Sequence, residues 1–447
     1  MSDFEELVGA SASLQDVVIP AFIRELDHLE CEPATGTQLV DEMHRRGINC
    51  RYLGRIANEC SYNHLRELAV REMVARVIKV LIRDGLSFLV EPDEEDAKAV
   101  VVHYLNECLT RMESDAHVTI WKYIDELLFK KYGFSTGTGA GGTTTVPVLN
   151  KIYMMGLVHS IAHKCGFKLD KYKGVDFESE LPFAARDIAS VHPVVKYRVC
   201  ASNEVREVLE RARELDGKGS RSMWYLTGGL ERAQCTELLR EALRYCEYVY
   251  GNTHIETGAV FLEAAEQLES RHAEKGRPEY SRWNKCAKIP PDEIGREAED
   301  YYRRALRIFE AELGVCDLRV AQCYLALSRI CKEEGDMAQV EYTLSAVDII
   351  ESLLGFMHPE TAEVYTQLAL QYQELEEMSL SEEAAPYIRK AFVIHMSLFG
   401  KEHEITQHTY KLLQGIEISV NSGLESASMS ELVERIEEME FGSTEGA

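Results

Sequence analysis

The chain has 447 residues, a formal net charge of −26 and 45% hydrophobic residues. This composition is typical of a soluble globular protein with two or three domains and excludes an intrinsically disordered chain. The negative charge excludes a general attraction to phosphate, so any nucleic-acid contact requires a local basic patch.

The twelve cysteines are scattered singly, without a C-x-x-C pair, and favour reduced thiols over a zinc ribbon or a disulfide framework. The first residues, MSDFEELVGA, lack the basic region and apolar run of a signal peptide. No stretch approaches the ~18 apolar residues that span a bilayer. We therefore expect a cytoplasmic protein without membrane insertion.

Residues 17–57 predict two helical segments separated by Pro33 and Gly36. Thr37 is expected to cap the second helix and Gly47 to end it. The phrase MHRRGINCRYLG follows at residues 43–54.

Residues 65–89 predict one strong amphipathic helix, because the apolar side chains fall within an arc of about 100° at ~100° per residue. These are Val70, Val74, Val77, Ile78 and Leu81. Basic residues are expected on the opposite side.

The stretch from residue 44 to residue 83 contains nine Arg and Lys against three Glu, so basicity is concentrated there. Such a patch could bind RNA phosphates through arginine forks. The candidate RNA-binding or ribosome-binding residues are His44, Arg45, Arg46, Arg51, Arg55, Arg71, Arg76, Lys79 and Arg83. The alternatives are pairing with acidic segments such as residues 91–96, which read EPDEED, or simple solvation.

Two sequence patterns match part of a functional motif but lack the other features that the motif requires. Residues 137–142 formally satisfy G-x-G-x-x-G, but the expected strand, helix and acidic residue are missing, so a flexible loop near residues 135–147 is expected. His159 and His163 have metal-ligand spacing, but zinc needs further ligands and a partly buried pair is expected instead. We predict no enzyme, no metal and no cofactor.

The second half contains a repeat anchored on Gly251, Gly314, Gly355 and Gly400. An alanine stands nine residues before each glycine and an aromatic residue ten residues after it. The alanines are Ala242, Ala305, Ala346 and Ala391, and the aromatics are Phe261, Tyr324, Tyr365 and Tyr410.

These offsets predict a helix, a left-handed glycine and a new helix opened by His358 and Pro359 or by Asp317. The spacing from the first to the second glycine is longer than the others, and residues 275–294 predict an inserted loop within one hairpin.

The repeat, with its L-G-x-x-H-P pattern, resembles the tetratricopeptide repeats of kinesin light chains and of the clustered-mitochondria family. The resemblance implies a concave groove lined by the first helix of each hairpin, which could hold a protein or peptide. The groove candidates are Gln322, Arg329, Lys332, Thr366, Gln373 and Lys411. Plain solvated positions are the alternative for each.

The phrase at residues 43–54 resembles the central region of the clustered-mitochondria family, which is associated with translation initiation factor three. Residues 99–109 and 187–202 match more loosely and in the same order. The family's members are longer, and this sequence resembles a version without their N-terminal domains, so functions of those domains are not carried over.

We therefore predict an all-α protein with a central helical domain at residues 1–215, a tetratricopeptide-type α-solenoid at 216–421 and a capping helix with an acidic tail at 422–447. The resemblance implies an adaptor that binds mRNA, the ribosome or initiation factor three and influences mitochondrial distribution or biogenesis. The alternative is a scaffold that binds peptides in the repeats without RNA contact.

Overall fold

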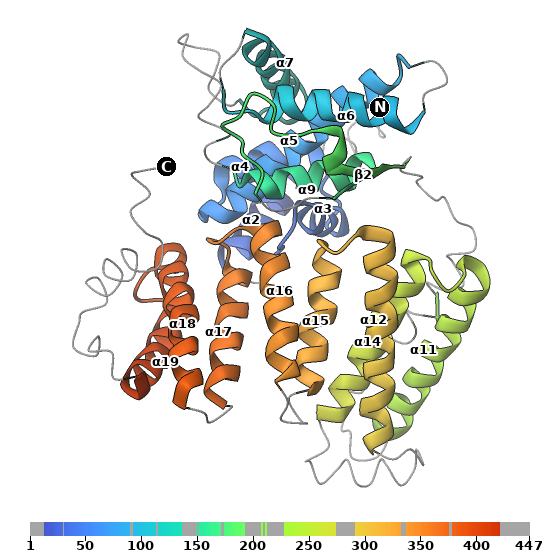
Figure 1. Cartoon of the computed structure of the whole chain (residues 1–447), viewed down its shortest axis with the longest axis vertical. Helices are drawn as coiled ribbons and strands as arrows, with labels where there is room; N and C mark the ends of the chain where they lie inside the picture. Colours follow the sequence, from blue (N-terminus) through green and yellow to red (C-terminus); the bar gives the residue numbers. More distant parts are fainter. Residues whose placement is uncertain are drawn as a thin grey trace. The chain divides into compact units, whose positions relative to one another are not determined.

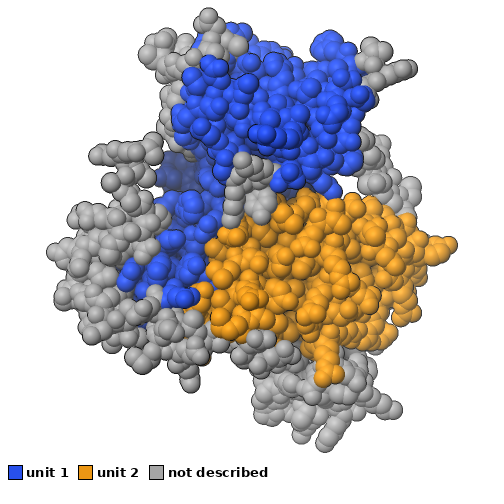
Figure 2. All heavy atoms as spheres, in the orientation of Figure 1, with its two compact units in different colours: residues 1–194, 350–369, 381–447 blue, residues 195–349, 370–380 orange. Residues whose placement is uncertain are grey.

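The computed structural model describes residues 13–420, apart from residue 30 and residues 90–92, 113–114, 136–148, 150–151, 171–173, 193–206, 209–210, 212–227, 274–290, 332–336 and 375–377. Helices dominate the described residues, which confirms the all-α prediction (Figure 1). The chain divides into two compact units (Figure 2). The first contains residues 1–194, 350–369 and 381–447, and the second contains residues 195–349 and 370–380.

The first unit begins with a helical module, which we call the N-terminal module (residues 14–191). Its elements are η1 (Leu14–Val18), α2 (Ile19–Asp27), α3 (Gly36–Arg45), η2 (Cys50–Tyr52), α4 (Leu53–Glu59), α5 (Asn63–Leu86), α6 (Glu94–Leu109), α7 (Asp115–Tyr132), α9 (Met154–Cys165), β1 (Phe167–Leu169), η3 (Ala185–Asp187) and β2 (Ile188–Val191). One hydrophobic core runs through the module and includes Trp121, Leu53 and Met43.

Helix α5 is the centre of this module and contacts α3, α4, α6, α7 and α9. The predicted helix is confirmed, but the prediction that its basic residues lie on a side away from the core is wrong for Arg71. Arg71 and Glu72 are both buried, because neighbouring helices cover α5 on several sides. Hydrophobic periodicity does not anticipate a charged side chain that is buried with a partner.

The N-cap of helix α3 (Gly36–Arg45) lies earlier in the sequence than expected. Thr35, not Thr37, is the N-cap: its hydroxyl accepts from the backbone N–H of Gln38 at 3.2 Å, and the Gln38 side chain accepts from the backbone of Thr35 at 3.1 Å. This reciprocal capping box satisfies two donors that the helix leaves free. The predicted stop at Gly47 is confirmed by its left-handed φ of 72°.

A short antiparallel pair of strands, β1 and β2, follows α9 and was not predicted. The buried amide of Asn106 on α6 holds the segment before β2, because it accepts from the Phe183 N–H at 2.8 Å and donates to the Phe183 carbonyl at 2.9 Å. Strands of three and four residues carry too little alternation to be recognised from sequence.

The repeat helices are α11 (Gly228–Tyr250), α12 (Ile255–Ala273), α14 (Pro291–Leu313), α15 (Leu318–Cys331), α16 (Ala338–Leu354), α17 (Pro359–Glu374), α18 (Met378–Phe399) and α19 (Glu404–Val420). The four anchor glycines separate α11 from α12, α14 from α15, α16 from α17 and α18 from α19, with φ between 78° and 88°. The predicted pattern of helix, left-handed glycine and new helix is therefore confirmed.

The repeat offsets correspond to recurring contacts. All four anchor alanines are fully buried, which allows neighbouring helices to approach closely. At two anchors the aromatic residue donates to a glutamate four residues before the glycine: Tyr324 to Glu310 at 2.8 Å and Tyr365 to Glu351 at 2.5 Å. Two of the four repeats thus add an inter-helix hydrogen bond to the apolar packing.

Residues that follow the glycine start the next helix as expected. The backbone N–H of Glu360 donates to His358 Nδ1 at 3.2 Å, and that of Arg319 donates to Asp317 at 2.9 Å. The expected inserted loop needs a correction at its end, because residues 291–294 belong to α14. Most of that loop, the glycine-rich stretch, the predicted boundary at residue 215 and the predicted cap at 422–447 lie outside the described residues.

Candidate functional site

The turn between α3 and η2 carries the family-like phrase at residues 43–54, and its uncharged residues shape the turn. Ile48 is fully buried and donates its N–H to the Met43 carbonyl at 2.8 Å. The Asn49 side chain accepts from the Arg51 N–H at 3.0 Å and caps η2. Gly54 lies so close to α7 that an added Cβ would stand 2.2 Å from the Tyr132 carbonyl oxygen. The uncharged residues of this phrase therefore determine the local fold.

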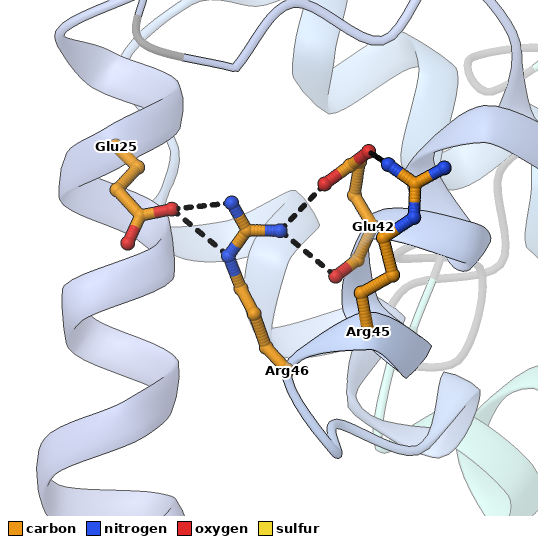
Figure 3. A network of polar contacts seen from close by, with 4 residues as sticks. All are labelled: Glu25, Glu42, Arg45 and Arg46. Atoms are coloured by element: carbon orange, nitrogen blue, oxygen red, sulfur yellow. Dashed lines mark hydrogen bonds and ion pairs between the residues drawn. The ribbon is translucent and has the colours of Figure 1, made fainter. Parts of the chain in front are cut away.

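The two consecutive arginines of this phrase share one carboxylate. Arg46 donates to Glu42 at 2.6 Å and to Glu25 on α2 at 2.9 Å, while Arg45 binds the other oxygen of Glu42 (Figure 3). The hydrogen bond with Glu42 is the main cause that raises the pKa of Arg46. The Arg46 guanidinium also lies over the Phe22 ring at 4.8 Å. Arg46 therefore links α3 to α2.

Three further candidates lie along η2 and the flanking helices. The Arg51 side chain is exposed and its guanidinium lies 5.4 Å from the centre of the Tyr52 ring. His44 is exposed as well. Arg55 donates to Glu59 at 2.6 Å and to the Gln15 carbonyl at 2.7 Å, so it helps to hold η1.

The basic residues of α5 have separate environments. Arg71 is only 5% exposed, with Nη1 at 3.8 Å from Glu67. Arg76 forms an ion pair with buried Glu72 at 2.6 Å, and Lys164 on α9 binds the same carboxylate at 2.8 Å. Burial lowers the pKa of Arg71. These residues organise the interior between α5 and α9.

The other two candidates on α5 are more accessible. Arg83 is 67% exposed and pairs with Asp84 at 2.7 Å, and Lys79 is half-buried. The alternative of pairing between the basic residues and the acidic segment at residues 91–96 takes a different form in the described part of that segment. Glu94 and Glu95 pair with Lys98 on their own helix, at 3.4 Å and 3.2 Å.

The structure therefore separates the nine candidates. Arg45, with its side chain 73% exposed, lies with exposed His44 and Arg51 on the α3–η2 turn. An exposed ion pair such as Arg45–Glu42 contributes about 0.2–1 kcal/mol, so a phosphate can compete for the guanidinium. We call Arg45 and Arg51 the turn cations.

The carboxylates that pair with the candidates were missed from sequence. Glu42 was recognisable in principle, since it stands three and four residues before Arg45 and Arg46 on one helix. Glu25 was not, because it lies on another helix.

The groove candidates lie on α15, α17 and α19. Gln322, Gln373 and Lys411 are exposed. Thr366 is half-buried, and its hydroxyl donates to the Ala362 carbonyl at 2.8 Å. Arg329 is exposed but binds Glu269 on α12 through two hydrogen bonds of 2.6 Å and 3.0 Å. Lys332 lies outside the described residues.

The histidine pair on α9 has one half-buried member, His159, and one exposed member, His163. Within the described part of the chain, no group of three or more His, Cys, Asp or Glu side chains is arranged to hold a metal ion. No described helix is both long and apolar enough to cross a membrane.

The fold defines a helical module and a set of tetratricopeptide-type hairpins, and the module is similar in sequence to a known family. The sequence family described as "Translation initiation factor eIF3 subunit 135" matches residues 30–127, which include α3 to α6 and most of α7.

Curated relatives extend the similarity beyond that segment. The Clustered mitochondria protein of Arabidopsis thaliana is 24% identical over 85% of this chain and 24% of its own length. The Clustered mitochondria protein homolog of Dictyostelium discoideum is 26% identical over 59% of this chain and 20% of its own length. The chain thus spans about a quarter or less of the length of these relatives, and the resemblance predicted from sequence is confirmed.

A solved structure, described as a Podosopora anserina putative kinesin light chain with nearly identical TPR-like repeats, is also similar. It is 16% identical, with a TM-score of 0.38, and the match covers 54% of this chain and 98% of that one.

Proposed function

We propose that the protein is a non-enzymatic cytoplasmic adaptor linked to translation, of the kind that supports mitochondrial distribution or biogenesis. Its N-terminal module contacts mRNA, the ribosome or initiation factor three, and its repeats hold a protein or peptide. The observation that carries the proposal is the position of the turn cations inside the segment similar to an initiation-factor subunit.

The shared carboxylate makes the turn suitable for binding phosphate. When Arg45 turns toward a phosphate, Glu42 keeps its ion pair with Arg46, so no carboxylate is left without a cation (Figure 3). Arg46 in turn keeps its contact with Glu25. Arg45 and Arg51 can therefore bind RNA phosphates without breaking the contacts that hold α2 to α3.

The test is charge reversal at the turn in the 447-residue chain. Arg45→Glu combined with Arg51→Glu is compared with Arg303→Glu combined with Arg304→Glu on α14. The control side chains are both 49% exposed, and each forms an ion pair within α14. Each variant replaces two arginines with two glutamates, so the two variants change the net charge equally. RNA affinity is measured over a range of salt concentrations.

We expect the turn variant to bind a panel of RNAs at least tenfold more weakly than the control. Its salt dependence should fall by about one unit of slope for each lost phosphate contact. Equal affinities of the two variants would contradict the proposal.

A second function is supported by a specific observation: Arg46, Arg55 and Arg76 are already paired with carboxylates. This second function is that of a scaffold that binds peptides through its repeats and does not contact RNA. Peptide binding that is lost on Gln322→Ala and Gln373→Ala, in a protein without measurable RNA affinity, would favour the scaffold.

A further inference from the structure

The four glycine turns have the same backbone geometry but different surroundings. An added Cβ at Gly251, Gly314 or Gly400 would meet no atom within 4 Å. At Gly355 it would stand 3.0 Å from the ring of Tyr153, a residue of the N-terminal module. The third turn is thus contacted closely by a segment about 200 residues earlier in the same compact unit.

Two side chains of the module bind the carbonyl end of α16. The Tyr153 hydroxyl donates to the Glu351 carbonyl at 2.9 Å, and Arg71 Nη1 lies 3.5 Å from the Leu353 carbonyl. The last carbonyls of a helix carry partial negative charge and can accept a further donor, and the Glu351 carbonyl also accepts from the Gly355 N–H at 3.0 Å. A buried guanidinium and a hydroxyl are suited to that end.

The module holds both side chains in place. Glu67 accepts from the Tyr153 N–H at 2.9 Å and lies 3.8 Å from Arg71, so one carboxylate positions both. Gly156 completes the approach, because an added Cβ there would stand 2.3 Å from Arg71 Nη1 and 2.6 Å from the Leu353 carbonyl. Glycines on both sides permit the close contact.

Aromatic contacts extend the same interface. His64 meets His358, the residue that caps α17, edge to face at 5.9 Å, and Tyr62 meets Phe399 on α18 in the same manner at 5.7 Å. Both histidines are buried. The interface therefore includes residues from α5, α9, the third glycine turn and the end of α18.

We propose that Tyr153 and Arg71 clamp the third glycine turn, so that the N-terminal module opens as one cooperative body with residues 350–369, which include the end of α16 and most of α17, and with residues 381–420. Local opening of α5 and α9 is then coupled to opening of α17, because the clamped turn is an element that they share. The inference depends on neither RNA binding nor peptide binding.

The test is amide hydrogen exchange of the full chain with two matched glycine variants. Gly355→Ala and Gly314→Ala both place alanine at a left-handed φ, 87° and 88°, so their backbone strain is equal. Only alanine at residue 355 meets Tyr153.

We expect Gly355→Ala to raise amide exchange in α5 and α9 at least tenfold, whereas Gly314→Ala changes exchange only near its own turn. Tyr153→Phe removes one hydroxyl and should raise exchange in α9 and α17 about fivefold; Tyr123→Phe, at an exposed position on α7, should not. If Gly355→Ala does not fold, Tyr153→Phe decides. Exchange in α5 and α9 that is unchanged in the folded variants would overturn the proposal.

Discussion

The repeat helices and the N-terminal module reach a stable fold in different ways. In the repeats, equivalent residues make equivalent contacts: the anchor alanine is buried at all four positions, and two repeats place a tyrosine on a glutamate. In the module, the polar contacts occur once each, such as Arg46 with Glu25 and Asn106 with Phe183. The stability of the repeats therefore depends on several equivalent contacts, whereas the stability of the module depends on individual contacts that differ from one another.

The largest expected effect comes from the buried charges of the module. Glu72→Gln leaves Arg76 and Lys164 without their common carboxylate, which is almost completely buried. We expect a loss of about 3 kcal/mol in the free energy of unfolding, measured by urea denaturation, because one member of a buried ionic group is removed. The comparison variant is Glu299→Gln on α14, whose partner Arg303 is exposed, and its expected loss is under about 1 kcal/mol. Equal losses would remove the distinction between the two regions.

A second large effect is expected at a helical glycine. In Gly54→Ala the new Cβ would stand 2.2 Å from the Tyr132 carbonyl oxygen, so the backbone of α4 or α7 must shift. We expect a loss of about 2 kcal/mol in thermal or chemical unfolding. Gly415→Ala on α19 is the control, since no atom lies within 4 Å of its Cβ position, and it should stabilise the protein slightly. A tolerated Gly54→Ala would mean that the turn is not tightly fixed.

Acid should weaken the contact between the module and the third turn. Burial lowers the pKa of His64 from 6.5 to about 4, and the pKa of His358 is lowered by burial and by nearby His64 and Arg71. A histidine with a lowered folded pKa contributes stability that is present above pH 6.5 and is lost as pH falls toward its folded pKa. The expected loss is at most about 1.4 kcal/mol per pH unit for each histidine.

The measurement is the free energy of unfolding at pH 5 and pH 7.5 for the protein and for His64→Gln, which should depend less on pH. Glu360 acts in the opposite direction, because burial raises its pKa to about 7 and its contribution is lost as pH rises from 4.5 through 7. Glu360→Gln therefore serves as the background for the comparison. An unchanged pH dependence in His64→Gln on that background would contradict the assignment.

The smallest expected effect concerns the repeats. Tyr365→Phe removes the hydroxyl that donates to Glu351 and should cost about 1 kcal/mol, measured by thermal unfolding. Tyr410 occupies the equivalent position in the repeat of Gly400, but the residue four before Gly400 is Met396, which has no carboxylate. Tyr410→Phe is therefore the comparison variant. We expect its effect to be smaller. A similar loss in both variants would show that the hydroxyl acts through something other than this repeated contact.

The repeated part of the fold was accessible from sequence because its signals recur at fixed offsets. The positions of Gly314 and Gly355 predicted left-handed turns, and both have φ near 88°. The module was less accessible. Thr35 and Thr37 are both acceptable caps in sequence, and only the position of Gln38 at the third helical residue favours Thr35.

The candidate site was accessible in part. A count of basic residues selected residues 44–83, which include the α3–η2 turn where Arg45 and Arg51 are exposed. It did not distinguish them from Arg71, because burial of an arginine depends on a partner, here the Leu353 carbonyl, that is 282 residues away. The RNA contact and the groove contacts stay predictions.

Sedimentation of the native protein through a sucrose gradient, with and without nuclease treatment, tests the proposed function most directly. We predict that part of the protein sediments with ribosomes or messenger ribonucleoprotein, that nuclease shifts the messenger-bound fraction to lighter fractions, and that Arg45→Glu combined with Arg51→Glu abolishes the association. Protein that sediments only as free chain in both gradients would contradict the translation-linked adaptor and leave the scaffold.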